Sequence, residues 1–157
     1  MLIKEKIGQL TSFPVDGRLV DVLELEWHEA SKRILRRHTR GGVEVAWQFL
    51  REGPALTEGD VLYADAERLI VVEIRACEVL VIRPGSFFKM AAICYEIGNR
   101  HVPLFYEEGE LLVPYELPLF RVLESAGYAV AKAGRKLLHP LKTTVAMHVP
   151  LVLTSGI

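Results

Sequence analysis

The chain has 157 residues, of which 50% are hydrophobic, and a formal net charge of −1 at pH 7. This is enough apolar material for one or two ordered cores, and the balanced charge argues against attraction to nucleic acid by an overall basic field. No apolar run approaches the roughly 20 residues that span a bilayer, and the first residues lack the apolar core of a signal peptide. We therefore expect a cytoplasmic protein with no membrane partner, and the two cysteines are too few for a disulfide scaffold.

The pattern of the first half predicts short strands joined by turns. Apolar residues alternate in LVDVLELEW and in VEVAWQFL, and Asp21 is the polar exception on the apolar side of the first segment. Further along, the segment ADAER joins two β-branched runs as a hairpin. The segment HEASKRILRRHTRGG has a composition that favours helix but is short and lies between strands. For this segment we predict an exposed hairpin closed by Gly41 and Gly42.

The hydrophobic period changes near residues 73–76. A strand in CEVLVIRPG stops at Pro84-Gly85, and Ser86 is a suitable N-cap for a following helix. The apolar face of this helix is expected to carry Phe87, Met90, Ile93, Cys94 and Ile97. We expect Gly98 to end the helix in the left-handed conformation, because a residue with a Cβ resists it.

The rest of the pattern predicts two strands around Glu108-Gly109, a helix that begins near Pro118 and a last strand in YAVAKAGRKL. The order strand, helix, strand, strand, helix, strand is the ferredoxin-like βαββαβ arrangement. The predicted fold is therefore α+β. It has a small all-β domain at residues 1–74, a ferredoxin-like domain at 75–138 and a C-terminal tail at 139–157. The tail is too apolar to be freely solvated, so we expect it to pack or to pair in an oligomer.

Metal binding is the first chemistry to weigh, because the chain has five histidines: His28, His38, His101, His139 and His148. They form no dense cluster and there is no Cys-x₂-Cys pair, which argues against a closed zinc site within one chain. A lone histidine is more often a surface residue than a ligand. His101 follows the predicted helix end beside Arg100, and a two-fold dimer with this residue on its axis would bring two imidazoles together. Imidazole suits Ni²⁺, Cu²⁺ and Zn²⁺.

Catalytic motifs are missing from the sequence. It has no Gly-x-Ser-x-Gly elbow, no Walker A loop and no dinucleotide fingerprint, so we expect a protein that is not an enzyme. The basic run SKRILRRHTR and the ferredoxin-like topology leave an alternative, an RNA- or protein-interaction module without a metal role. The predicted strands offer mainly aliphatic residues and have no RNP-like run of glycine and aromatic residues for base stacking, so we expect no nucleic-acid partner. The basic run then either binds an acidic protein surface or is a solvated face.

The segment IGNRH, residues 97–101, resembles the Gly-Asn-Arg-His signature of the UreE family, the nickel metallochaperones of urease maturation. The likeness extends through the basic run and the Thr-Gly turn into the elements Leu-x₂-Gly-x₂-Leu and Gly-Asp-x-Leu. These elements comprise Leu50, Gly53, Leu56, Gly59, Asp60 and Leu62. The strand, the helix and GNRHVPL follow in the family's order and spacing, so the resemblance covers residues 1–135.

The resemblance implies a homodimer held through the ferredoxin-like domains, with His101 of each protomer binding one shared Ni²⁺ and with Zn²⁺ or Cu²⁺ as competitors. It implies delivery of Ni²⁺ to apo-urease, with the urease apoprotein and other urease accessory proteins as partners. It also implies a partner- or peptide-binding role for the all-β domain. Many members end in a histidine-rich tail, which this chain lacks. Members without that tail often supply one tail histidine to the metal, which makes His148 the second candidate ligand; His139, next to Pro140, fits less well.

Overall fold

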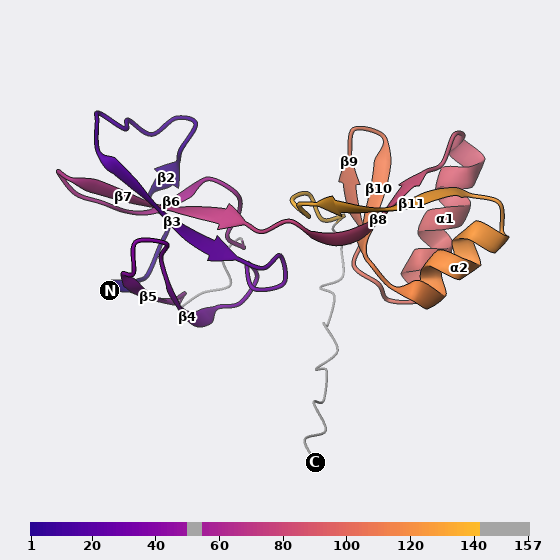
Figure 1. Cartoon of the computed structure of the whole chain (residues 1–157), viewed down its shortest axis with the longest axis horizontal. Coiled ribbons are helices and arrows are strands. Elements are labelled where there is room, and N and C mark those ends of the chain that lie inside the picture. The colour runs from indigo at the N-terminus through magenta and orange to yellow at the C-terminus, as the bar shows by residue number, and fades with distance from the viewer. Residues whose placement is uncertain (50–54, 142–157) are drawn as a thin grey trace, which may run out of the picture.

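The computed structural model describes residues 1–49 and 55–141, which form an all-β N-terminal region and a C-terminal domain of one sheet and two helices. Figure 1 shows an elongated molecule with these two parts at opposite ends, joined through the short segment between β7 and β8. This arrangement confirms the predicted α+β class. None of the helices in the described ranges is long and apolar enough to cross a membrane.

Short strands build the N-terminal region in two sheets, in the orders β1-β5-β4 and β2-β6-β7-β3. The strands are β1 (Leu2–Ile3), β2 (Gly8–Gln9), β3 (Leu19–Leu25), β4 (Ile34–His38), β5 (Glu44–Gln48), β6 (Asp60–Ala64) and β7 (Arg68–Ile74). The predicted alternation is confirmed, because Leu23, Leu25, Val45 and Trp47 are buried in one core. The basic segment is also the predicted hairpin, with β4 antiparallel to β5.

Asp21, the polar exception in β3, is buried, and both of its carboxylate oxygens accept hydrogen bonds. The hydroxyl of Thr39 donates to its Oδ2 at 2.6 Å, and the backbone N–H of Gly41 donates to its Oδ1 at 2.8 Å. A Cβ at Gly41 would lie 2.7 Å from Asp21 Oδ2, so the close approach requires glycine. Because a buried carboxylate without partners is costly, these bonds hold the turn of the β4–β5 hairpin against β3.

The C-terminal domain has the predicted βαββαβ order. Its elements are β8 (Cys77–Arg83), α1 (Phe87–Asn99), β9 (Phe105–Glu107), β10 (Glu110–Pro114), α2 (Leu117–Ser125) and β11 (Ala129–Arg135). The strands form one antiparallel sheet in the order β11-β8-β10-β9, and both helices lie on the same face of it (Figure 1). Apolar side chains of the helices and the sheet form the core, and burying each contributes roughly 1.5–3 kcal/mol. They are Leu80, Ile82, Ile93, Ile97, Leu111, Val113, Leu119 and Leu123.

The other face of this sheet packs against the chain that follows β11 and against one residue of the N-terminal region. Leu137 packs there with Val79 and Val81, and Trp27 reaches the same cluster from the end of β3. The ring of Trp27 meets that of Phe105 edge-on, with 5.7 Å between the ring centroids. An ion pair of 2.8 Å between Lys136 and Glu58 adds a second contact between the two parts.

Candidate metal centre

His101 lies on the turn that follows α1, and the turn differs from the predicted one. The helix begins as predicted, with the N–H of Lys89 donating to the Ser86 hydroxyl at 3.2 Å. The prediction that Gly98 ends the helix is wrong. Gly98 is helical, the helix continues to Asn99, and His101 itself takes the left-handed conformation, with φ of 55°.

Backbone bonds of the last turn explain the shift. The N–H of Arg100 donates to the carbonyl of Ile97, and the N–H of His101 donates to that of Gly98, both at 3.1 Å. These i to i−3 bonds tighten the end of the helix and satisfy carbonyls that would otherwise lack partners. The side chain of Ile97 is buried in the core and holds this turn on the sheet. Left-handed backbone is uncommon for residues other than glycine, although asparagine, aspartate and histidine adopt it more readily than most.

His101 is exposed, and its charged neighbour Arg100 is paired with a carboxylate. Arg100 Nε donates to the carboxylate of Glu96 at 3.1 Å, four residues back along the helix. An exposed ion pair of this kind contributes little stability, but it partly offsets the positive charge nearest to His101. The turn therefore presents one accessible imidazole from a backbone that the helix end holds in place.

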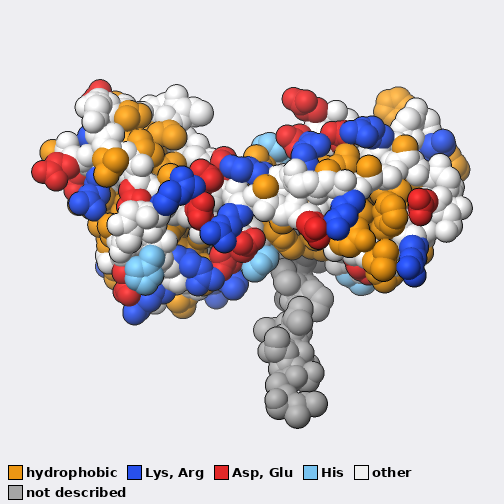
Figure 2. Space-filling model, in the orientation of Figure 1, with side chains coloured by type: hydrophobic (Ala, Val, Ile, Leu, Met, Phe, Trp, Pro, Cys, Tyr) orange, Lys and Arg blue, Asp and Glu red, His pale blue; other side chains and the backbone are white. Residues whose placement is uncertain are grey.

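The same helix carries an exposed apolar stripe. Phe87, which we expected on the buried face, is 97% exposed, and that expectation is wrong because this first residue of the helix lies outside the core cluster. Ala91 and Tyr95 follow at intervals of four, and Phe88 lies beside them. We call Phe87, Phe88, Ala91 and Tyr95 the α1 stripe. Figure 2 shows hydrophobic side chains gathered over the helical end of the molecule, and monomeric proteins rarely leave such surface uncovered.

The described chain ends beside β9. The N–H of Tyr106 donates to the carbonyl of His139 at 3.0 Å, and the N–H of Leu141 donates to that of Leu104 at 2.8 Å. Residues 139–141 therefore run antiparallel to β9 at the edge of the sheet. At Leu141 the chain is heading back toward the turn that holds His101. His148, the second predicted ligand, lies outside the described residues.

Among the residues that the structure describes, other metal ligands do not gather around His101. Within residues 1–49 and 55–141, no three His, Cys, Asp or Glu side chains are close enough together to hold a metal ion. The two cysteines are free and partly buried, and burial raises the pKa of the Cys77 and Cys94 thiols, which disfavours the thiolate that binds metals. His28 packs edge-on against Trp27 in the N-terminal region. One described chain thus offers a single exposed imidazole at this turn.

Comparison with known proteins gives matches along most of the chain. The model of "UreE urease accessory protein, N-terminal domain" matches residues 3–75, and that of "UreE urease accessory protein, C-terminal domain" matches residues 77–138. The urease accessory protein UreE of Flavobacterium johnsoniae is 43% identical over 148 residues, which cover 94% of this chain and 90% of that protein. Those of Helicobacter pylori and Acetivibrio thermocellus are 38% and 36% identical, over 94% and 90% of this chain and 88% and 92% of theirs.

Proposed function

Since the chain belongs to the UreE family of urease accessory proteins, we propose that it binds Ni²⁺ and delivers the ion to apo-urease during assembly of the urease active site. Its membership in a family of accessory proteins confirms the prediction that it is not an enzyme. The observation that carries the nickel proposal is the exposed imidazole of His101 on a turn anchored by α1. We further propose a cytoplasmic location, with the urease apoprotein and other urease accessory proteins as partners.

The proposed site is shared between two protomers. In a homodimer with His101 near the two-fold axis, each chain contributes one imidazole to the same Ni²⁺. The α1 stripe supports this assembly, because it is exposed apolar surface on the helix that leads into the turn of His101. A second copy packed there would remove the stripe from water, which is favourable at about 25 cal/mol per Å² of apolar surface. We also propose that the chain divides into domains at residues 1–74 and 75–138, followed by the tail at 139–157.

A cargo site has different requirements from a structural one. A shell of few protein ligands, open to solvent, holds Ni²⁺ tightly enough to collect it and loosely enough to transfer it. Imidazole nitrogen is a suitable ligand for Ni²⁺, and Zn²⁺ and Cu²⁺ compete for the same donor. Because the site is completed only across the interface, release of the ion does not require either chain to unfold.

His148 is the further ligand that we propose. The chain leaves Leu141 in the direction of His101. Leu104, whose carbonyl accepts from the Leu141 N–H, is three positions after that histidine. An extended chain advances up to about 3.3 Å per residue, so the seven residues from Leu141 to His148 span up to about 23 Å. The stretch from His101 to Leu104, in the loop before β9, spans at most about 10 Å by the same measure. His148 is therefore within reach of His101, whereas the backbone of His139 is already held against β9.

Calorimetric titration of the metal-free full chain with Ni²⁺ tests the proposal. We expect one tightly bound ion per two chains. The variant His101→Asn keeps a residue that tolerates the left-handed turn. It should weaken Ni²⁺ binding more than about a hundredfold, because losing even a residue that only supports a metal ligand lowers metal affinity about 10–100-fold. His148→Ala should weaken binding by a smaller factor, and the exposed His28→Asn should leave it unchanged. Parental affinity in His101→Asn would refute the proposed site.

A further inference from the structure

The N-terminal region and the C-terminal domain are joined by a covalent link and by a second segment of the chain. The covalent link is residues 75–76, between β7 and β8. The second segment is residues 136–141, which follow β11, and we call it the strap. The strap contacts both parts of the molecule and continues directly into the tail that carries His148. A change at the tail can therefore reach the N-terminal region through the strap.

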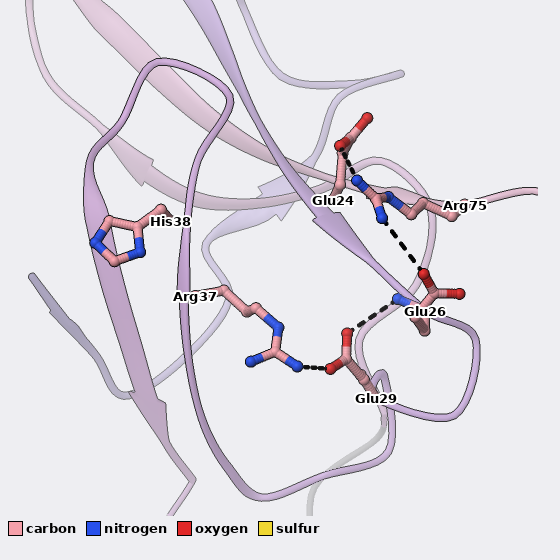
Figure 3. A pocket seen from close by; sticks show the side chains of 6 residues that line it. All are labelled: Glu24, Glu26, Glu29, Arg37, His38 and Arg75. Carbon is pink, nitrogen blue, oxygen red and sulfur yellow. Dashed lines mark hydrogen bonds and ion pairs between the residues drawn. The ribbon is translucent and has the colours of Figure 1, made fainter.

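The covalent link is fastened to β3 on its N-terminal side. The N–H of Arg75 donates to the carbonyl of Leu25 at 2.8 Å. The guanidinium of the same residue pairs with Glu24 at 2.9 Å and with Glu26 at 3.5 Å. Figure 3 shows Arg75 between these two carboxylates, at one side of a charged pocket of about 250 Å³. Because residue 75 is fixed in this way, the two parts can change their relative position only at or beyond Ala76.

Successive residues of the strap pack on different parts of the molecule. Leu137 is 3% exposed and lies in the cluster on the helix-free face of the C-terminal sheet, which Trp27 joins from the N-terminal region. Leu138, the next residue, packs against the N-terminal core. Because these two side chains contact different parts, the strap lies between the parts and its burial depends on their docking.

An ion pair adds a polar contact at the start of the strap. Lys136 Nζ lies 2.8 Å from Glu58 Oε1, and Glu58 Oε2 accepts from the N–H of Ile74 at 2.6 Å. Ile74 is the last residue of β7 and directly precedes the covalent link. Glu58 thus joins the start of the strap to the end of β7, although a partly exposed ion pair adds little stability.

The far end of the strap is held to β9 by sparse contacts. The N–H of Tyr106 donates to the carbonyl of His139 at 3.0 Å, and the N–H of Leu141 donates to that of Leu104 at 2.8 Å. Residues 139–141 are all exposed. A segment with few buried contacts and solvent-exposed backbone bonds opens at a lower free energy than a core strand does. A ligand that binds only the docked form can therefore shift this equilibrium.

The proposed metal ligands lie on the two chain segments that this pairing joins. His101 lies three positions before Leu104, and His148 lies seven positions after Leu141. A Ni²⁺ ion bound to both histidines would close a loop around the bond between Leu104 and Leu141 and oppose its opening. In reverse, the docked strap keeps His148 near His101. If only a fraction of the molecules is docked, the apparent affinity for the ion is reduced by that fraction.

We propose that the strap couples Ni²⁺ loading to the docking of the N-terminal region on the C-terminal sheet. When His101 and His148 hold the ion, the strap stays along β9, and Leu137 and Leu138 keep the two parts together. Without the ion the strap opens more often, and the N-terminal region is held less firmly. This inference rests on the proposed function and adds to it a conformational signal of whether the chain carries its cargo.

Calorimetric titration of the full chain with Ni²⁺ tests the coupling from the side remote from the metal. Leu138→Ala should weaken Ni²⁺ binding about fivefold or more, because it loosens the strap without removing a proposed ligand, and couplings between sites are typically about 5- to 150-fold. Leu10→Ala is the matched control, since Leu10 is also partly buried but packs in a separate cluster, and it should bind like the parent. Circular dichroism checks that both variants are folded. Parental affinity in Leu138→Ala would overturn the proposal.

A double-mutant cycle tests whether the tail carries the coupling. In the His148→Ala background, Leu138→Ala should leave the remaining Ni²⁺ affinity unchanged within about twofold, because the strap then leads to no ligand. An equal loss of affinity from Leu138→Ala in both backgrounds would show that the strap does not act through the tail, and the proposal would be wrong.

Hydrogen exchange followed by mass spectrometry measures the docking of the strap. Saturating Ni²⁺ should slow exchange of the amides of Tyr106 and Leu141 at least about fivefold in the parent and should leave it unchanged in His148→Ala. The amide of Leu19, which donates to the carbonyl of Glu67 at the far end of β3, should not respond in either protein. Equal exchange with and without Ni²⁺ in the parent would contradict the coupling.

The strap and the metal site fail in different experiments. Loss of Ni²⁺ binding in His101→Asn together with parental binding in Leu138→Ala would overturn the role of the strap and leave the metal site standing. Parental binding in His101→Asn would refute the metal site, and the role of the strap would be refuted with it.

Discussion

His101 combines an accessible imidazole with a backbone conformation that most residues avoid. In the left-handed region a Cβ crowds the following carbonyl, at a cost of roughly 1–2 kcal/mol. The bonds of the tightened helix end and the burial of Ile97 offset that cost. The side chain is consequently held at a defined place on the turn, although it packs against no core.

Substitution at His101 separates its backbone role from its metal role. We expect the free energy of unfolding of metal-free His101→Gly to exceed that of His101→Ala by about 1 kcal/mol, because only glycine lacks the Cβ that strains this turn. Both variants should lose Ni²⁺ binding. Urea unfolding of the metal-free proteins measures the difference, and equal stability of the two variants would contradict a left-handed residue at this position.

At the scale of elements, the β4–β5 hairpin is fastened to β3 through the polar cluster of Asp21, Thr39 and Gly41. The cluster also restricts residue 41 to glycine, because the Asp21 carboxylate fills the space that a side chain there would need. The N–H of Arg40 donates to the carbonyl of Val22 beside it, at 2.7 Å, so the placement of β4 next to β3 depends on this cluster.

A double-mutant cycle tests this fastening. Gly41→Ala should lower the free energy of unfolding by about 1–3 kcal/mol, the usual cost of overpacking, because the new Cβ meets Asp21. In the Asp21→Ala background the same change should cost less, with a coupling of at least about 0.5 kcal/mol. Gly134→Ala in β11 is the control, since a Cβ there has no neighbour within 4 Å, and it should stay within about 0.5 kcal/mol of the parent. If the effects of Gly41→Ala and Asp21→Ala on the free energy of unfolding were additive, the close contact between residues 21 and 41 would be contradicted.

At the scale of the whole molecule, Trp27 connects the two parts of the chain. It packs in the N-terminal core and also in the cluster on the helix-free face of the C-terminal sheet, against Phe105. The ion pair of Lys136 and Glu58 spans the same contact but is partly exposed, so it contributes at most about 1 kcal/mol. We therefore expect the aromatic contact, together with Leu138 packed on the N-terminal core, to couple the two parts more strongly than the ion pair does.

Removing that contact should separate their unfolding. The chain has two tryptophans, so in Trp27→Ala the fluorescence comes from Trp47 in the N-terminal core, while the helical circular dichroism comes from the C-terminal domain. We expect the two signals to follow one urea transition in the parent and separate transitions in the variant. Lys136→Ala, which removes only the ion pair, should keep the transitions together. Coincident transitions in Trp27→Ala would show that other contacts couple the parts.

Local patterns in the sequence determined the elements and the motif. Alternation predicted β3 and β5, Ser86 predicted the start of α1, and Glu108-Gly109 predicted the hairpin of β9 and β10, where both turn residues have positive φ. These features depend on interactions between residues a few positions apart, which the sequence displays directly. The Gly-Asn-Arg-His segment likewise identified His101 as the candidate ligand.

Only the tertiary structure decided how these elements end and what they leave uncovered. α1 continues past Gly98 because burial of Ile97 and the bonds of its last turn outweigh the local preference for a glycine stop. The exposure of Phe87 and the positions of β3 and β4 as end strands of their sheets depend on how distant segments pack. The direction of the chain at Leu141 also depends on a distant segment, because the Leu141 N–H donates to the carbonyl of Leu104. The candidate functional residues could be identified from the sequence, whereas the surfaces on which they lie depend on long-range hydrogen bonds and packing.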